Sequence, residues 1–242
     1  MRILTYLFFE DVLKRLFIIF EKNAIINSII KTMILVIFLM ETRENKMEFN
    51  KENVINILNN LNLDENINLI NIPQIDLYMD QVIQLFESNL SGTKRNKEDK
   101  LLTKTMINNY SKDKILLPVK NKKYSRNHVI LMILIYNLKQ SLSISDIKGL
   151  FRNLVSDLQN EKLCNINLPK LYEEFLEIQK EENIRSKDYI EDIIKKVEET
   201  IDADENKEYE KLLLTVFALI NGANIQRRLA EKIIDNYFNN YD

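Results

Sequence analysis

The chain has few of the residues from which many catalytic and metal sites are built. Its 242 residues include one cysteine, Cys164, and one histidine, His128. One cysteine excludes a disulfide framework and a cysteine-based zinc site, and one histidine makes a Ser-His-Asp triad or a multi-histidine metal site very hard to build. Three glycines and three prolines leave too few turn residues for an all-β sandwich or barrel, and too few glycines for a phosphate-binding loop. The composition therefore predicts a mostly helical protein that is not an enzyme and carries no cofactor.

Charge is balanced overall but unevenly distributed. Hydrophobic residues make up 45% of the chain, charged residues make up 29%, and the formal net charge is −2. This composition is that of a folded protein, long enough for one large domain or two small ones. Between residues 93 and 128 the net charge is +8, and between residues 170 and 210 it is −8. A dense basic block is typical of a surface that neutralises nucleic-acid phosphates, although lysines in a solvated loop give the same composition.

Residues 1–46 differ in character from the rest of the chain. Residues 24–40 carry a single charge, the central Lys31, whereas a membrane span needs about 20 apolar residues and no central charge. Two charged stretches precede the apolar run and no small-residue cleavage site follows it, so a signal peptide fits poorly. Three interpretations stay open: an amphipathic or membrane-associated helix, a helical hairpin packed on the body, or an extension that precedes a working start at Met47. Membrane contact through residues 1–46 is the less favoured expectation.

Apolar spacing and capping residues predict the helices. Thr103, Ser125 and Ser143 are expected N-caps, and the helix from 127 to 138 is apolar enough to be buried. Leu77 and Tyr78 are expected on the apolar face of a helix that begins near Ile75. The full set of expected helices covers residues 50–61, 75–86, 103–112, 127–138, 146–159, 169–182, 186–200, 208–221 and 224–238, and the last two meet at Gly222. No stretch recurs at a fixed period, which excludes a solenoid.

Four motifs in the middle of the chain carry the functional expectation. They are Thr103–Tyr110, Ile115-Leu-Leu-Pro118, Lys120–Ser125 and Leu142–Lys148. In this order they resemble the DNA-binding domain of the MerR family of transcription regulators. There a recognition helix ends in an aromatic residue, a Leu-Leu-x-Pro follows, and a basic wing ends in Tyr-Ser. The resemblance implies that Thr103 is the N-cap of the recognition helix, Ile107 a core residue of that helix and Tyr110 the tyrosine at its end. It also implies that Tyr124 is the tyrosine that ends the wing, and that the cap of the later helix is formed by Ile144–Lys148.

The chain departs from the MerR pattern at three points. The wing, Lys120–Tyr124, is short and has no glycine or arginine; Lys114 stands where a turn glycine is usual; and residues 88–100 form a long linker before the recognition helix. The resemblance therefore does not imply which bases are contacted. Short polar side chains on such a helix can reach base edges, and flanking lysines can hold phosphates.

A second resemblance rests on longer motifs, Ile72–Val82, Leu102–Tyr110 and Tyr124–His128. They are similar to the Firmicute family called domain of unknown function 1836, over about residues 72–154 of this chain. That family has no established chemistry, and its members resemble MerR-like regulators. Frequent asparagine, lysine and isoleucine fit an AT-rich bacterial genome.

We therefore expect an all-α fold with a winged helix-turn-helix-like (MerR-like) module. The expected regions are an apolar extension (1–46), a helical lead-in (47–69), the DNA-binding module (70–160) and a helical dimerisation or effector region (161–242). The expected function is a cytoplasmic, non-enzymatic regulator that binds double-stranded DNA as a homodimer and answers to an effector that the sequence does not identify. The expected DNA contacts are Thr103, Lys104, Thr105, Asn108, Asn109, Lys112, Lys120, Lys122, Lys123, Tyr124 and Arg126. The alternative is a helical protein-interaction scaffold that binds an acidic partner or an anionic membrane.

Other residues have simpler expected roles. His128 is expected to have a simple packing role, with a helix-start or phosphate-contact role as the alternative, and Asp80 is expected to be solvated. Cys164 is expected to be incidental. Self-association is expected from the apolar side chains Leu212, Leu213, Val216, Phe217, Leu219 and Ile220.

Overall fold

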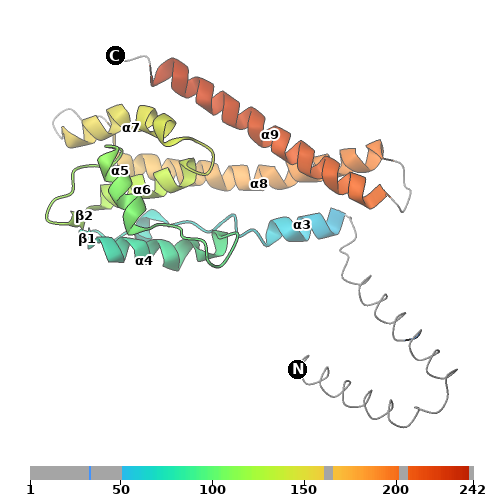
Figure 1. The fold of residues 1–242 in the computed structure, drawn as a ribbon, viewed down its shortest axis with the longest axis horizontal. Helices are drawn as coiled ribbons and strands as arrows, with labels where there is room; N and C mark the ends of the chain where they lie inside the picture. The colour runs from blue at the N-terminus through green and yellow to red at the C-terminus, as the bar shows by residue number, and fades with distance from the viewer. Residues whose placement is uncertain (1–32, 34–50, 161–165, 202–206, 240–242) are drawn as a thin grey trace, which may run out of the picture. The chain divides into compact units, whose positions relative to one another are not determined.

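The computed structural model describes Met33 and residues 51–160, 166–201 and 207–239 (Figure 1). The chain divides into two compact units, Met1–Glu48 and Phe49–Asp242, and the description below concerns the second. The interpretations of residues 1–46 and the expectation for Cys164 fall outside the described residues.

The second unit is mostly helical, which confirms the expected helix content. Its described residues form seven α-helices and one two-stranded sheet, in the order α3 (Lys51–Asn59), β1 (Leu77–Tyr78), α4 (Met79–Leu90), α5 (Lys104–Lys112), β2 (Lys123–Tyr124), α6 (Arg126–Leu138), α7 (Ile144–Gln159), α8 (Leu168–Thr200) and α9 (Glu208–Tyr237). Strands β1 and β2 are antiparallel, with Leu77 opposite Tyr124 and Tyr78 opposite Lys123. None of the helices in the described ranges is both long and apolar enough to cross a membrane.

Three helices begin at the capping residues that the sequence predicts. The Thr103 hydroxyl accepts the Met106 N–H at 3.1 Å at the start of α5. At the start of α7, Ser143 accepts the Asp146 N–H, while the Asp146 carboxylate accepts the Ser143 N–H, both at 3.1 Å. Such reciprocal bonds satisfy backbone donors that the helix itself leaves unpaired. The caps fix where the module's helices start and hence which faces point outward.

Helix α6 lies at the centre of the core. Residues 128–133 and Ile135 are all buried, as the apolar run predicts. Phe86 of α4 contacts Tyr136 edge to face at 6.1 Å. The core does not end at residue 160, where the module was expected to end, because Leu168 and Tyr172 of α8 are fully buried within it. The Tyr172 hydroxyl donates to the Ile67 carbonyl at 2.7 Å, which joins α8 to the segment before β1. The same core also includes Ile234 of α9.

The C-terminal helices differ from the expectation, because α8 and α9 are each continuous where two helices were predicted. Gly222 lies within α9 rather than at a junction. A Cβ atom there would stand 2.6 Å from the Tyr189 hydroxyl of α8, so the glycine gives α8 and α9 room to pack closely. Within α8, Asn183 donates to the Leu63 carbonyl at 2.8 Å, which anchors the helix at the predicted break.

The start of α4 also differs from the expectation. Residues 75–78 are not helical, and Leu77 and Tyr78 form β1. The Leu77 side chain is buried, but Tyr78 is 54% exposed, so it does not share the apolar face of α4. The Gln81 side chain accepts the Tyr78 N–H at 2.8 Å, and this bond sets the helix start at Met79.

Candidate nucleic-acid interface

Helix α5 has one buried face and one exposed polar face. Ile107 is fully buried and Tyr110 is 4% exposed, and burial raises the pKa of the Tyr110 hydroxyl above its usual value. The exposed side chains are Thr105, Asn108, Asn109 and Lys112. Their spacing of i, i+3, i+4 and i+7 places them on a single stripe of the helix. The helix therefore presents two amides, a hydroxyl and an ammonium group to solvent.

The first turn of α5 is fixed to the first turn of α4. The Lys104 Nζ lies 2.7 Å from Asp80 Oδ1, and both side chains are largely exposed. Asp80 is thus solvated, as expected, and also pairs with Lys104. Thr103 is half-buried and its hydroxyl oxygen is occupied by the cap, so Thr103 positions the helix instead of offering a free contact.

The expected wing is a tight turn made of lysines. The Lys123 N–H donates to the Lys120 carbonyl at 3.0 Å, and the two central residues have positive φ, 52° at Asn121 and 58° at Lys122. Positive φ at both central positions is the type I′ geometry, which joins antiparallel strands and favours Asn-Gly. A lysine in this left-handed region costs roughly 1 kcal/mol. Lys120 and Lys122 are nonetheless exposed at its tip.

The start of α4 links this lysine turn to α5. The Lys123 ammonium lies 5.3 Å from the centre of the Tyr78 ring, and Tyr78 directly precedes α4. Two residues later, Asp80 binds Lys104 of α5. In Figure 1, β1, β2 and α5 lie near the same end of α4. We call the exposed stripe of α5, the residues 120–123 and Tyr78 the α5–turn surface.

Two predicted contact residues do not lie on this surface. Tyr124 is 4% exposed, and its ring meets His128 edge to face at 5.7 Å. Arg126 is half-buried, and its Nη2 donates to the Leu69 carbonyl at 2.7 Å. In the structure Tyr124 packs in the core and Arg126 ties down the preceding loop, and DNA contact by either residue stays a prediction.

His128 also lies inside the module, as the packing interpretation expects. Its Nδ1 accepts the Ser125 N–H at 3.1 Å, and its Nε2 donates to the Leu117 carbonyl at 3.1 Å. This pair of bonds defines the neutral tautomer protonated on Nε2. Burial lowers the pKa of His128, opposed more weakly by bonds to the Leu117 and Pro118 carbonyls. A neutral, buried imidazole does not hold a phosphate.

Tyr78 is the surface residue that the sequence reasoning missed. The helical spacing of apolar residues assigned it to the apolar face of a helix, whereas it is the exposed residue of β1 and lies beside Lys123. The signal was Gln81, because a glutamine three residues after a position marks that position as a helix N-cap. In the described part of the chain, no three or more His, Cys, Asp or Glu residues come close enough to hold a metal ion.

The fold and this surface define a small helical module with a two-stranded sheet. Residues 67–175 match the model of the family described as "Domain of unknown function (DUF1836)". The match supports the family resemblance predicted from the motifs, and its limits enclose the hydrogen bond between Tyr172 and the Ile67 carbonyl. Comparisons with curated proteins and with solved structures give no match.

Proposed function

We propose that the chain is a non-enzymatic, DNA-binding transcription regulator whose α5–turn surface contacts double-stranded DNA. The observation that carries the proposal is the exposed stripe of α5, which is capped and rigidly packed on its other face. The order of α5, the lysine turn, α6 and α7 agrees with the order of motifs on which the resemblance to MerR-like winged helix-turn-helix modules rests. In such modules the second helix enters the major groove.

The side chains of the surface divide into two roles. Thr105, Asn108 and Asn109 are short and polar, and an asparagine can bond to both edge atoms of an adenine. Lys112, Lys120 and Lys122 are flexible charges at the ends of the surface, suited to phosphates. None of these three lysines has a carboxylate partner among the described residues. Lys104 differs, because a phosphate would compete with Asp80 for it.

A homodimer is part of the proposal, and α9 supports it. Ten large apolar side chains of α9 are exposed: Tyr209, Leu212, Leu214, Val216, Phe217, Ile220, Ile225, Leu229, Ile233 and Tyr237. Exposed apolar surface of this extent is unusual on a monomer. Tyr209, Leu212, Val216 and Ile220 follow one stripe, which a second copy can cover by the same stripe. A two-fold dimer also suits DNA sites with two-fold symmetry.

The first test separates phosphate contacts from bulk charge. Binding of the full chain to a labelled random duplex is followed by fluorescence anisotropy between 50 and 200 mM salt, a range over which phosphate contacts weaken steeply. Lys120→Ala and Lys122→Ala should each weaken binding and flatten the salt slope by about one unit. Lys196→Ala is the matched control, since this exposed lysine lies in the acidic helix α8 and should change nothing.

The second test concerns base contacts. A preferred site is first selected from a random library, and Asn108→Ala should then cost roughly 1–3 kcal/mol on that site and much less on random duplex. Asn153→Ala, an exposed asparagine of α7, is the control. If the Asn108 and lysine variants behave identically on both duplexes, α5 is not a recognition helix. If the unchanged chain shows no salt-dependent DNA binding, the scaffold alternative replaces the regulator.

A further inference from the structure

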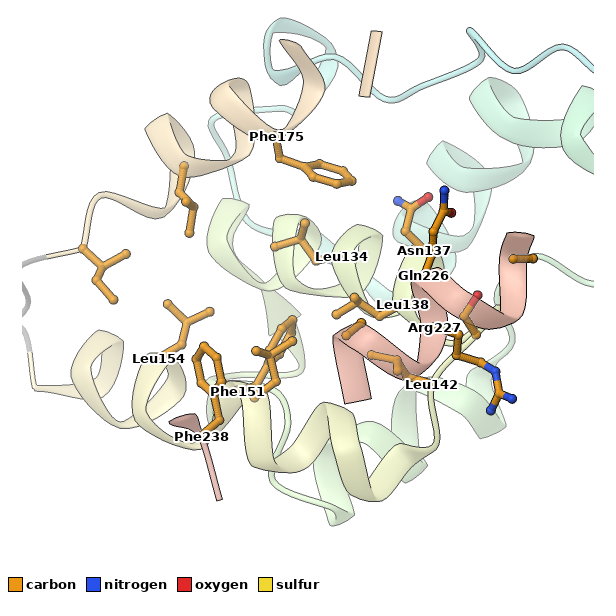
Figure 2. Close-up of a pocket in the computed structure, with 16 residues that line it drawn as sticks. Leu134, Asn137, Leu138, Leu142, Phe151, Leu154, Phe175, Gln226, Arg227 and Phe238 are labelled. Atoms are coloured by element: carbon orange, nitrogen blue, oxygen red, sulfur yellow. The ribbon is translucent and has the colours of Figure 1, made fainter. Parts of the chain in front are cut away.

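A second candidate site is a pocket whose lining includes no residue of the α5–turn surface. This pocket of about 730 Å³ is walled by α6 and α7 of the module and by α8 and α9 (Figure 2). Small-molecule sites typically occupy about 300–1,000 Å³ and are lined mainly by apolar side chains with a few polar groups. The lining of this pocket has that composition, because leucine and phenylalanine side chains make up most of it.

The two ends of the pocket differ in chemistry. Figure 2 shows Phe151, Leu154 and Phe238 gathered at one end, and Asn137, Gln226 and Arg227 at the other. The apolar end is built into the core, since Phe151 is only 3% exposed. The polar end thus carries two amides and the Arg227 guanidinium, which is ion-paired with Glu231, while the rest of the wall is mostly apolar.

The Arg227 guanidinium can bind an anion at the polar end of the pocket. Its Nη1 donates to Glu231 Oε1 at 2.8 Å, and the Arg227 side chain is 41% exposed. A guanidinium has five N–H donors in a planar fork, so this single bond leaves donors available for a carboxylate. The Asn137 Nδ2 is already bonded to the Ile133 carbonyl at 3.0 Å, which fixes the amide and leaves its oxygen as an acceptor.

We propose that the pocket binds a small amphipathic acid, with its hydrocarbon part against Phe151 and Phe238 and its carboxylate at Arg227. The hydrocarbon part of the ligand removes the apolar lining from contact with water. The Arg227 guanidinium donates a charge-assisted hydrogen bond to the carboxylate. A neutral hydrocarbon would leave the polar end unused, and a hydrophilic anion would leave the apolar end unfilled. The division of the lining therefore selects a molecule with both parts.

The position of the site suggests what the ligand does if the chain is a regulator, and this step rests on the proposed function. The pocket touches α9 at residues 223–230 and 238, whereas the apolar stripe assigned to the dimer lies nearer its start, at residues 209–220. A ligand held between α7 and the later part of α9 fixes the angle at which the earlier part leaves the module. Ligand and dimer partner then act on the same helix at separate places.

The test uses decanoate as the probe and the full chain as the protein. Isothermal titration calorimetry below the micellar concentration should show saturable binding of decanoate and weaker binding of decan-1-ol, which has the same chain without the charge. Arg227→Gln should reduce decanoate affinity about tenfold, as expected for a lost charge-assisted bond, and leave decan-1-ol unchanged. The neighbouring Arg228→Gln is the matched control, because Arg228 does not line the pocket.

A pocket-filling variant gives an independent readout. Ala230→Phe adds a ring to the wall and should abolish binding of both probes, with circular dichroism used to check that the helices remain. No saturable decanoate binding, or equal effects of the Arg227 and Arg228 variants, overturns the proposal. DNA affinity measured without a probe is independent of these results, so failure of the ligand site and failure of the DNA interface are distinguishable.

Discussion

The hydrogen bond between Tyr172 and the Ile67 carbonyl makes a sharp prediction about what holds the module together. It joins α8 to the segment before β1 across 105 residues, at 2.7 Å, and both residues are 0% exposed. Tyr172→Phe keeps the ring and its stacking on Phe175 at 6.4 Å and removes only the hydroxyl. Leaving a buried carbonyl without its hydrogen-bond donor lowers the free energy of unfolding by about 1–3 kcal/mol. Because small domains are stable by only about 5–15 kcal/mol, this loss is readily measured.

Urea unfolding followed by circular dichroism is the assay. The variant should lower the midpoint by an amount equivalent to about 1–3 kcal/mol while the slope stays unchanged. Tyr209→Phe is the control, because Tyr209 is 70% exposed. Removing its hydroxyl should change the free energy of unfolding by no more than about 0.5 kcal/mol. Burial also raises the pKa of Tyr172 well above its ordinary value of 10.0, so the unfolded state ionises first as pH rises. The unchanged chain should therefore lose stability above about pH 10, and the variant should lose less.

A Tyr172→Phe chain as stable as the unchanged chain would refute this reasoning. It would mean that the Ile67 carbonyl is solvated, and that α8 is not an integral part of the module. The same result would remove the physical explanation for a family match that runs to residue 175.

Three further predictions follow from the caps, the turn and α9. His128→Gln keeps an acceptor for the Ser125 N–H. Because burial lowers the pKa of His128 in the folded state, the unchanged chain should lose stability as pH falls below 6.5. The variant should lose less stability over the same range, which melting curves at several pH values will measure. Lys122→Gly should raise the unfolding free energy by about 1 kcal/mol, since glycine has no penalty at positive φ, yet weaken DNA binding. Asn121→Gly, which keeps every charge, should leave DNA affinity unchanged. Val216→Glu, at a residue that is 53% exposed, should convert a dimer to a monomer in light scattering; a monomeric unchanged chain would contradict the dimer.

The sequence predicted local features well because local chemistry decides them. Thr103, Ser125 and Ser143 were identified as N-caps from residue type and position, and each begins a helix in the structure. The apolar run of α6 also predicted its burial. A helix of 13 residues that is apolar on most of its faces is stable only when it is buried.

Tertiary contacts decided what the sequence could not show. The continuity of α9 through Gly222 depends on Tyr189 of a different helix, whereas glycine alone suggests a helix end. The burial of Tyr124 and the bond of Arg126 to Leu69 depend on β1 and on the loop before it. Charge and aromatic patterns identify a basic region, but they do not distinguish a tyrosine that faces the core from one that faces solvent. For this reason Tyr78, which was expected on a core-facing helix surface, is exposed, and Tyr124, which was expected at DNA, is buried.

Two lysines in unfavourable backbone conformations, one directly after α5 and one in the lysine turn, add support to the proposed DNA interface. Lys114 follows α5 with φ of 59°, where the Ile115 N–H donates to the Tyr110 carbonyl at 3.1 Å, a helix ending that strongly favours glycine. Lys122 has φ of 58° at a turn position that also favours glycine. Each costs the folded chain roughly 1 kcal/mol, and neither ammonium group has a carboxylate partner in the described ranges. Backbone hydrogen bonds of the helix ending and of the turn hold both conformations, so the proposed interface gives a reason for lysine rather than glycine at each position. Strain of this kind concentrates at functional sites, and under the proposed function DNA phosphates are the anions that the two ammonium groups would meet.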